Sequence, residues 1–385
     1  MFSLKKRIYI STFVNSFGSW LTFLAIALMT QEKYGTQHVA IVFLVQTLPA
    51  IILSRGLASL VPADAVKKVY WVTQVLLGLC SFLLILNQSL WAIYIFLFVT
   101  SVLKSLGNPL FNTLIGEWIK PEDQKEVFTR VGALQAGTLA LAPAAGAWIK
   151  IASSASFLFI IDGISFLIGV IVLLELFRNS TKNIKSEKFV FTWKTIFAGI
   201  SPRPGGIPLL IQKGLLVWFL YLAVGALINA IEFPAFQRAA MTEQLIGYAM
   251  AAWGLGNLFA FLVKSPVNEK NLFVVFCFAL LCFSFVANAH VLIVSFLFAG
   301  ALSSYLSGAI RANIQNSVPE GYHATPVWAY ANQMTQIINL IAYSSVGFLL
   351  GYLGFYTFGA ILILLAAVMS YKYLSANLSL QKVRG

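Results

Sequence analysis

Two basic residues lie inside long apolar runs, where a charge is costly. Lys104 lies halfway along the run 90–116, about 20 Å from either end if the run is helical. An ionisable side chain near the centre of a bilayer costs about 2.5–3.5 kcal/mol, so it needs a compensating role. A buried ammonium can bind an anionic group of a substrate, or it can pair with a carboxylate on a neighbouring helix. We favour substrate binding for Lys104 and keep the structural pair open.

Arg311 lies in the run 290–316, within about two turns of its end. Three roles are open for its guanidinium. It can contact a substrate, it can form a gating ion pair with Glu117 at the end of the run 90–116, or it can extend to the membrane surface. We rank substrate contact first and the gate with Glu117 second.

Glu232 lies near the end of the run 211–235, two residues before Pro234. A carboxylate in apolar surroundings can carry protons, which makes Glu232 the candidate proton-coupling residue. The alternative, which we prefer slightly, is a carboxylate at the membrane surface that is hydrated or paired with Arg238. Asp162, near the start of another apolar run, is expected to have a structural role.

Uncharged polar side chains in the apolar runs form a further group of candidate substrate-binding residues. Its members are Asn15, Ser19, Gln135, Asn332, Gln333 and Gln336. Asn15 and Ser19 are four residues apart, which places them on one face of a helix. Such groups can bind a substrate or can hydrogen-bond one helix to the next, and both interpretations stay open.

The composition indicates which elements must carry these residues. Of 385 residues, 59% are hydrophobic and 10% are Asp, Glu, Lys or Arg, against about 25% charged residues in a soluble domain. A transmembrane helix needs about 20 mostly apolar residues, and the chain contains twelve such segments. They are 8–30, 38–61, 69–87, 90–116, 127–150, 155–178, 211–235, 242–264, 271–288, 290–316, 326–350 and 352–375. The sequence therefore predicts an all-α membrane protein with twelve transmembrane helices, and it excludes a soluble enzyme or DNA-binding protein.

The longest hydrophilic stretch, 179–210, is basic and contains a Pro/Gly-rich segment. It predicts a cytoplasmic linker between an N-terminal six-helix bundle, 1–178, and a C-terminal six-helix bundle, 211–385. Of the 26 Lys and Arg residues, 21 lie at the termini or in loops on the side of this linker, and three lie on the opposite side. The positive-inside rule therefore places both termini in the cytoplasm.

A weak internal repeat supports two equivalent halves. The stretch 118–122 (WIKPE) aligns with 316–320 (NSVPE) at an offset of 198 residues, and the same offset places Gln135 on Gln333. An even number of segments separates the two copies, which predicts the same topology in both halves.

These features together resemble the major facilitator superfamily, in particular its macrolide-efflux and siderophore-exporter branch. The motifs that carry the resemblance are FGSWLT (17–22), QTLPA (46–50), GNP (107–109), APAAG (142–146) and IDGISF (161–166). The resemblance implies two pseudo-symmetric six-helix halves around a central cavity that is lined by the first, fourth, seventh and tenth helices.

One signature of the family is altered in this chain. The family usually carries an acidic residue and a basic pair between its second and third helices. Here Pro62 takes the acidic position, Asp64 is the nearby substitute, and Lys67 and Lys68 form the basic pair. The resemblance implies that Asp64, Lys67 and Lys68 belong to a cytoplasmic gate.

The resemblance also implies a function. It indicates a secondary transporter that moves a small amphiphilic molecule (a siderophore, metabolite or drug) across a bacterial inner membrane by alternating access, with export favoured. The two cations within apolar runs, Lys104 and Arg311, indicate a substrate of anionic character. The alternatives are an importer of a siderophore or organic anion, and a lysophospholipid flippase. The chain has no GxxxxGK[ST] loop, so a gradient must supply the energy, and protons are the candidate coupling ion. We expect no enzymatic activity, cofactor, metal site or nucleic-acid partner, and we expect a monomer surrounded by membrane lipids.

Overall fold

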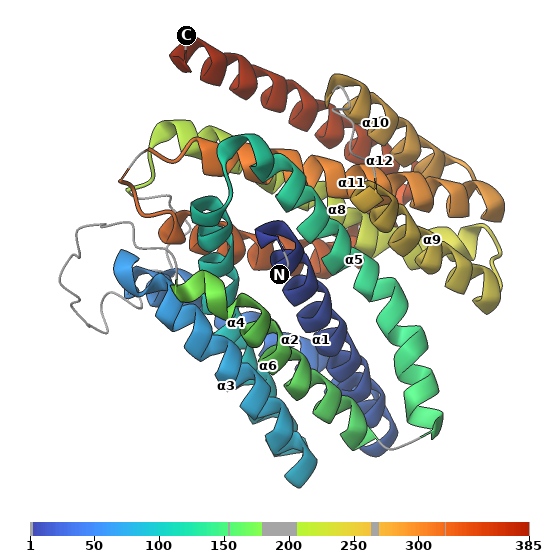
Figure 1. Ribbon diagram of the computed structural model, residues 1–385. Helices are drawn as coiled ribbons and strands as arrows, with labels where there is room; N and C mark the ends of the chain where they lie inside the picture. Colours follow the sequence, from blue (N-terminus) through green and yellow to red (C-terminus); the bar gives the residue numbers. More distant parts are fainter. Residues whose placement is uncertain (1–2, 153–154, 179–205, 263–268, 320, 385) are drawn as a thin grey trace. The chain divides into compact units, whose positions relative to one another are not determined.

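The chain forms long α-helices joined by short loops (Figure 1). The computed structural model describes residues 3–152, 155–178, 206–262, 269–319 and 321–384. The helices are α1 (Leu4–Tyr34), α2 (Thr36–Ser59), α3 (Val66–Leu86), α4 (Leu90–Trp118), α5 (Pro121–Ala152), α6 (Ala155–Arg178), α8 (Leu209–Arg238), α9 (Glu243–Leu262), α10 (Glu269–Phe285), α11 (Ala289–Asn316) and α12 (Thr325–Arg384), with a short 3-10 helix η1 (Ala63–Ala65) before α3.

The element α12 contains two helices, because Gly354 interrupts it with a non-helical backbone (φ 72°, ψ 165°). Glycine is the residue that adopts a positive φ without steric cost. Within the described ranges there are therefore twelve α-helices, and each overlaps one of the twelve predicted segments. The prediction of an all-α membrane protein with twelve helices is confirmed.

Local signals in the sequence mark several helix ends. Ser89 Oγ accepts a hydrogen bond from the Ala92 amide (3.4 Å) at the start of α4. Asn288 Oδ1 accepts one from the Val291 amide (3.2 Å) at the start of α11. Such caps satisfy N-terminal amides that have no partner inside the helix. Gly35, with a φ of 92°, separates α1 from α2.

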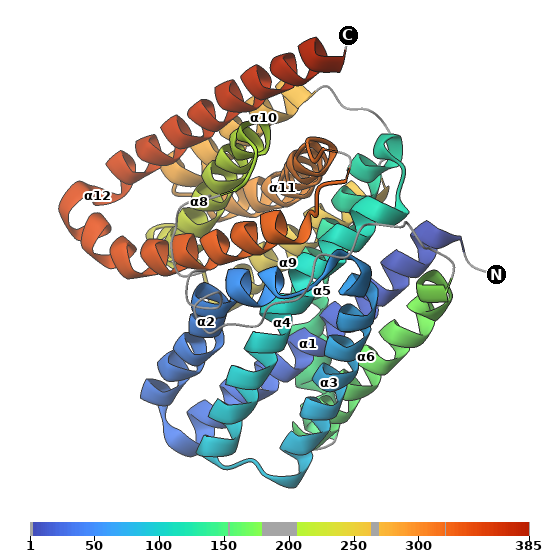
Figure 2. The same cartoon turned by 90° about the vertical axis from the view of Figure 1, so that its left-hand side faces the viewer.

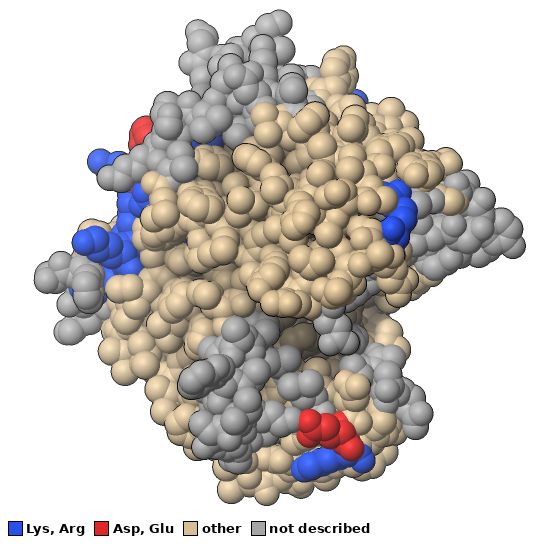
Figure 3. Space-filling model, turned by 90° about the vertical axis from the view of Figure 1, so that its right-hand side faces the viewer, with Lys and Arg blue, Asp and Glu red and all other residues tan. Residues whose placement is uncertain are grey.

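The outer surface of the helices is apolar. Seven helices of the described residues are long and apolar enough to cross a membrane, and α4 and α11 are among them. Leu86, Trp91 and Leu209 are 82%, 74% and 71% exposed. In Figure 3 a wide area carries no charged side chains, and the Lys, Arg, Asp and Glu side chains gather at its margins. Soluble monomers rarely expose large apolar patches, so this surface is suited to lipid.

The helices pack into two compact units. The first unit consists of Met1–Lys120, Leu141–Pro204 and Glu320–Gln336, and the second of Pro121–Ala140, Gly205–Pro319 and Ile337–Gly385. In the first, α6 packs against α1 and α3, and α4 packs against α2 and α3 (Figure 2). In the second, α11 packs against α8, α9 and α10. The predicted bundles 1–178 and 211–385 stay predictions, and most of the predicted linker 179–210 lies outside the described residues.

Two helices, α5 and α12, pass from one unit to the other. The start of α5, Pro121–Ala140, packs in the second unit, and the start of α12 belongs to Glu320–Gln336, which packs in the first. Adding the repeat offset of 198 to 121–140 gives 319–338, which nearly coincides with 320–336. The exchange is therefore reciprocal, as expected for two halves related by an internal repeat.

The start of α5 approaches α11 closely at a glycine. A Cβ atom added at Gly308 would lie 2.5 Å from both the Cα and the N of Thr129, a distance that real contacts essentially never show. A Cβ atom added at Gly132, further along α5, would meet Ser307 Oγ at 3.8 Å, an ordinary contact. Gly308 thus permits the backbones of α5 and α11 to approach each other, whereas Gly132 has room for a methyl group.

We predict that Gly308→Ala destabilises the protein by about 1–3 kcal/mol, because the added methyl group overpacks the α5–α11 contact. Gly132→Ala is the matched control, and its better helix propensity should leave stability unchanged or slightly raised. Thermal unfolding of both variants in the same detergent measures the difference. Equal melting temperatures for the two variants would contradict the close approach of α5 and α11.

Candidate functional site

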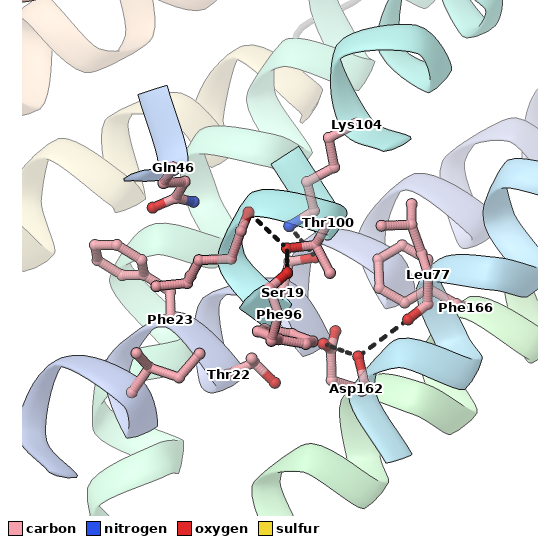
Figure 4. Close-up of a pocket in the computed structure, with 13 residues that line it drawn as sticks. Ser19, Thr22, Phe23, Gln46, Leu77, Phe96, Thr100, Lys104, Asp162 and Phe166 are labelled. Carbon is pink, nitrogen blue, oxygen red and sulfur yellow. Dashed lines mark hydrogen bonds between the residues drawn. The ribbon is translucent and has the colours of Figure 1, made fainter. Parts of the chain in front are cut away.

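A polar pocket inside the first unit contains two charged side chains that lie within apolar helices. Lys104 lies at the midpoint of α4, and Asp162 lies on α6, where its side chain is only 3% exposed. Both line the pocket, and Figure 4 shows them reaching it from different helices, with Ser19 and Thr22 nearby. The remaining lining residues are Phe23, Ile26, Gln46, Leu77, Ser81, Phe96, Leu97, Thr100 and Phe166.

The two charges interact electrostatically across this pocket. Lys104 Nζ donates a hydrogen bond to Ser19 Oγ on α1 (3.4 Å), and Ser81 Oγ on α3 donates one to Asp162 Oδ2 (2.8 Å). The second carboxylate oxygen, Asp162 Oδ1, is buried and makes no hydrogen bond within the described part of the chain. The ammonium and the carboxylate therefore compensate each other through space, while their hydrogen bonds go to the hydroxyl groups of Ser19 and Ser81.

Glycine and asparagine residues hold α1 close enough to form this pocket. A Cβ atom added at Gly18 would lie 2.9 Å from Asp162 Oδ1, so only glycine permits this approach of α1 to α6. Asn15 Nδ2 donates a hydrogen bond to Gln74 Oε1 on α3 (3.2 Å). The side chain of Asn15 also occupies the space that a Cβ atom at Gly169 of α6 would need. Asn15 therefore packs between α1, α3 and α6 and supports the position of Ser19.

The size of the pocket limits what it can hold. Its volume is about 20 Å³. A water molecule needs about 10–15 Å³ on this measure, whereas sites for drug-sized ligands have volumes of about 300–1,000 Å³. In this conformation the pocket can take a water molecule or a group of ionic size, and a larger substrate could place only one polar group in it.

Two of the predicted substrate-binding amides connect helices of the first unit. Gln333 Nε2 on α12 donates a hydrogen bond to the Ile51 carbonyl of α2 (2.8 Å), and Gln333 is fully buried. Asn332 Nδ2 donates to Ser54 Oγ (3.1 Å), which in turn donates to the Ser105 carbonyl of α4 (2.9 Å). These contacts connect the start of α12 to α2 and α4. Both amides therefore hydrogen-bond one helix to another, which is the second of the two roles that the sequence leaves open.

The structure places the two remaining amides differently. Gln135 on α5 is exposed, and Gln336 on α12 is half-buried. Their part in substrate binding stays a prediction.

Arg311 lies in a second buried polar cluster, within the second unit. Its guanidinium carbon lies 4.7 Å from the centre of the Phe128 ring at the start of α5, and Arg311 is 7% exposed. It interacts electrostatically with Tyr221 on α8, whose hydroxyl group is 2.6 Å from Ser303 Oγ of α11. Stacking on an aromatic ring is favourable for a guanidinium whose hydration is restricted. Glu117, the predicted gating partner of Arg311, belongs to the first unit, so this pair stays a prediction.

Of the predicted gating residues, the structure brings Lys67 and Glu117 together. The Glu117 carboxylate at the end of α4 acts electrostatically on the Lys67 ammonium at the start of α3. Asp64 in η1 and Lys68 in α3 are exposed. The loop between α2 and α3 is thus linked to the end of α4 by charge.

Glu232 is only partly exposed and lies on α8 near Tyr343 of α12, with which it interacts electrostatically. Pro234 does not end the helix: α8 continues through it to Arg238. A proline inside a transmembrane helix is tolerated because neighbouring groups satisfy the freed backbone. The Arg238 guanidinium lies over the Tyr356 ring at 5.3 Å. The proton-coupling role of Glu232 stays a prediction.

The partnership of Lys104 with Asp162 is the main feature of the site that the sequence did not resolve. Lys104 was identified by its position in mid-helix, and a pairing with some carboxylate was one of its two roles. Asp162 lies 58 positions away, and no spacing rule connects the two residues. The feature of the sequence that could have pointed to Asp162 is that few carboxylates lie within the apolar runs of the first half. Within the described residues, no group of three or more His, Cys, Asp or Glu side chains is arranged to hold a metal ion.

Comparisons with known proteins identify a matching family and several similar solved structures. Residues 8–343 match the Major Facilitator Superfamily. Among solved structures, the chain is similar to a bacterial homologue of the iron transporter ferroportin in an outward-facing state (16% identity, TM-score 0.74, covering 98% of this chain and 100% of that one). It is also similar to the human organic anion transporter MFSD10 (12% identity, TM-score 0.73, covering 96% of this chain and 100% of that one). A third similar structure is the E. coli fucose:proton symporter (12% identity, TM-score 0.67, covering 97% of this chain and 98% of that one). No match was found among curated protein sequences.

We predict that Ser54→Ala destabilises the protein by about 1–3 kcal/mol, because it removes the donor to the Ser105 carbonyl and leaves the Asn332 amide without this acceptor. Ser59→Ala on the same helix is the control, since Ser59 is exposed and donates its hydrogen bond to the Gly56 carbonyl within α2 (2.7 Å). Thermal unfolding distinguishes the two variants. If Ser54→Ala melts together with Ser59→Ala, the polar contacts do not hold α12 to α2 and α4.

Proposed function

Because the chain belongs to the major facilitator superfamily, we propose that it is a secondary transporter that moves a small anionic or amphiphilic molecule across the membrane by alternating access. The observation that carries the substrate class is the Lys104 ammonium, which lies at mid-span in a polar pocket. An ammonium in an apolar bundle attracts an anionic group strongly, because few other polar groups compete for it.

The surroundings of Lys104 support a binding role as well as a structural one. Its hydrogen bond to Ser19 is long, at 3.4 Å, and both side chains are only partly buried. An incoming carboxylate could replace this weak contact with a charge-assisted hydrogen bond. Arg311, which is buried in the second unit, is a further proposed contact for an anionic group. The similarity to an organic anion transporter agrees with this substrate class.

The sequence resemblance proposes finer details. It indicates a siderophore, metabolite or drug as the substrate, export as the direction, and the bacterial inner membrane as the location. The distribution of Lys and Arg favours both termini in the cytoplasm. The proposed state of the chain is a monomer. Glu117, Arg311, Asp64, Lys67 and Lys68 are the proposed cytoplasmic gate, in which Lys67 and Glu117 already interact. Energy comes from an ion gradient, with protons as the proposed coupling ion.

The experiment compares small molecules inside cells and in the medium after deletion of the gene and after its restoration, under iron limitation. If the chain exports an anionic metabolite, that compound accumulates inside the deleted cells and is missing from the medium. If it imports the compound, the compound persists in the medium and its uptake fails. Unchanged anionic metabolites on both sides would contradict the proposed substrate class.

We predict that restoration with Lys104→Gln lowers transport of the identified compound by about tenfold or more. A hydrogen bond to a charged group contributes about 1.5–3 kcal/mol, and about 1.4 kcal/mol corresponds to a factor of ten. Lys213→Gln is the control, since Lys213 on α8 is exposed. Membrane levels and melting temperatures of both variants are measured beside the flux. Full transport by a folded Lys104→Gln protein would exclude Lys104 from the substrate site.

A further inference from the structure

The pocket between α1, α3, α4 and α6 has a simple charge balance. Thirteen residues line it, and among these Lys104 and Asp162 alone are ionisable. The groups that act on the Asp162 carboxylate are the hydroxyls of Thr22 on α1 and Ser81 on α3 and, electrostatically, the Lys104 ammonium on α4. With both charged groups in place the pocket is neutral.

An anionic group that binds Lys104 disturbs this balance. The pocket would then hold one cation and two anions, and the Asp162 carboxylate would lose the partner that compensates it. An uncompensated charge in an apolar interior is costly, and a carboxylate removes that cost by taking up a proton. Asp162 Oδ1 is the available position, because Oδ2 already accepts the hydrogen bond from Ser81.

We propose that Asp162 is the proton-coupling site and that it binds one proton together with each anionic group that binds Lys104. The proton is taken up from solution on Oδ1 and gives a neutral carboxylic acid, while Lys104 stays an ammonium and becomes the partner of the anion. When the anion leaves, the Lys104 ammonium again compensates the Asp162 carboxylate through space and the proton is released. This inference rests on the proposed function and names the residue through which protons act, in place of Glu232.

A proton fits this pocket better than an alkali ion. Sodium would need a shell of several oxygen ligands beside an ammonium that already supplies the positive charge. The volume of about 20 Å³ leaves room for about one water molecule, which can bring a proton to Oδ1.

Co-binding also determines the direction in which a proton gradient acts. If anion and proton occupy the pocket together, an inward proton gradient drives the anion inward. A cationic group would instead compete with the ammonium for Asp162, and the same gradient would drive it outward. For an anionic substrate the Lys104–Asp162 pair therefore favours import over the export that the sequence resemblance implies.

The test uses the full-length protein in lipid nanodiscs and needs no substrate. Infrared spectroscopy detects the C=O stretch of a protonated carboxylic acid. Lys104→Met leaves the Asp162 carboxylate without a compensating charge, which is also the effect expected of an arriving anion. The infrared spectrum of this variant should therefore gain one such band at neutral pH. The band should be absent from the wild type and from Lys104→Arg, and it should be lost in the double variant Lys104→Met/Asp162→Asn.

The proposal is overturned if folded Lys104→Met shows no band that depends on Asp162. Lys104→Gln is used in its place if Lys104→Met does not fold. If neither folds, the ammonium cannot leave Asp162 for a substrate, which also contradicts the proposal.

A second measurement separates this proposal from the proposed function. For the compound identified by the metabolite comparison, Asp162→Asn should still exchange it across vesicle membranes but should lose accumulation driven by a proton gradient. Retained accumulation would exclude Asp162 as the coupling site and leave the transport function intact. Conversely, the infrared band without transport of any anionic compound would refute the proposed function and leave the proton site intact.

Discussion

The interaction on which the first unit depends is the mutual compensation of two buried charges, the Lys104 ammonium and the Asp162 carboxylate. Neither charge could be placed alone in an apolar bundle without a large cost. Their pairing requires α1, α3, α4 and α6 to meet at one level, and Gly18 permits α1 to approach α6 there. The hydroxyl groups of Ser19 and Ser81 then complete the polar surroundings of both charges. The same charge balance links ligand binding to proton binding. A charged ligand that binds one of the two side chains changes how readily the other is protonated.

The packing of α5 and α12 reflects the internal repeat of the chain. Each helix begins in one unit and ends in the other, and the segments that cross over are related by the offset of 198 residues found in the sequence. Hydrogen bonds from Asn332 and Gln333 hold the start of α12 against α2, while Gly308 lets the start of α5 lie close to α11. Such a reciprocal arrangement is expected for two halves that are related by an internal repeat.

The fold could be predicted from the sequence to a large extent, and the site only in part. Long apolar runs determine transmembrane helices almost by themselves, because a bilayer accepts few other structures, and all twelve segments have their helices. Lys104 was identifiable because a lysine at mid-span is rare. Its partner was not, because the contact between α4 and α6 depends on tertiary packing that no spacing encodes. The amides of Asn332 and Gln333 could not be assigned for a related reason: one of their acceptors is a backbone carbonyl, at Ile51, which leaves no mark in the sequence.

A double-mutant cycle shows whether Lys104 and Asp162 act as one unit. Thermal unfolding is measured in the same lipid for the wild type, Lys104→Met, Asp162→Asn and the double variant. Coupled residues typically show interaction energies of about 0.5–3 kcal/mol. If the two charges compensate each other, each single variant is destabilised and the double variant is more stable than the sum of the two losses allows, because no charge is then left alone in the pocket. Strictly additive losses would show that the two residues act independently and that they do not compensate each other.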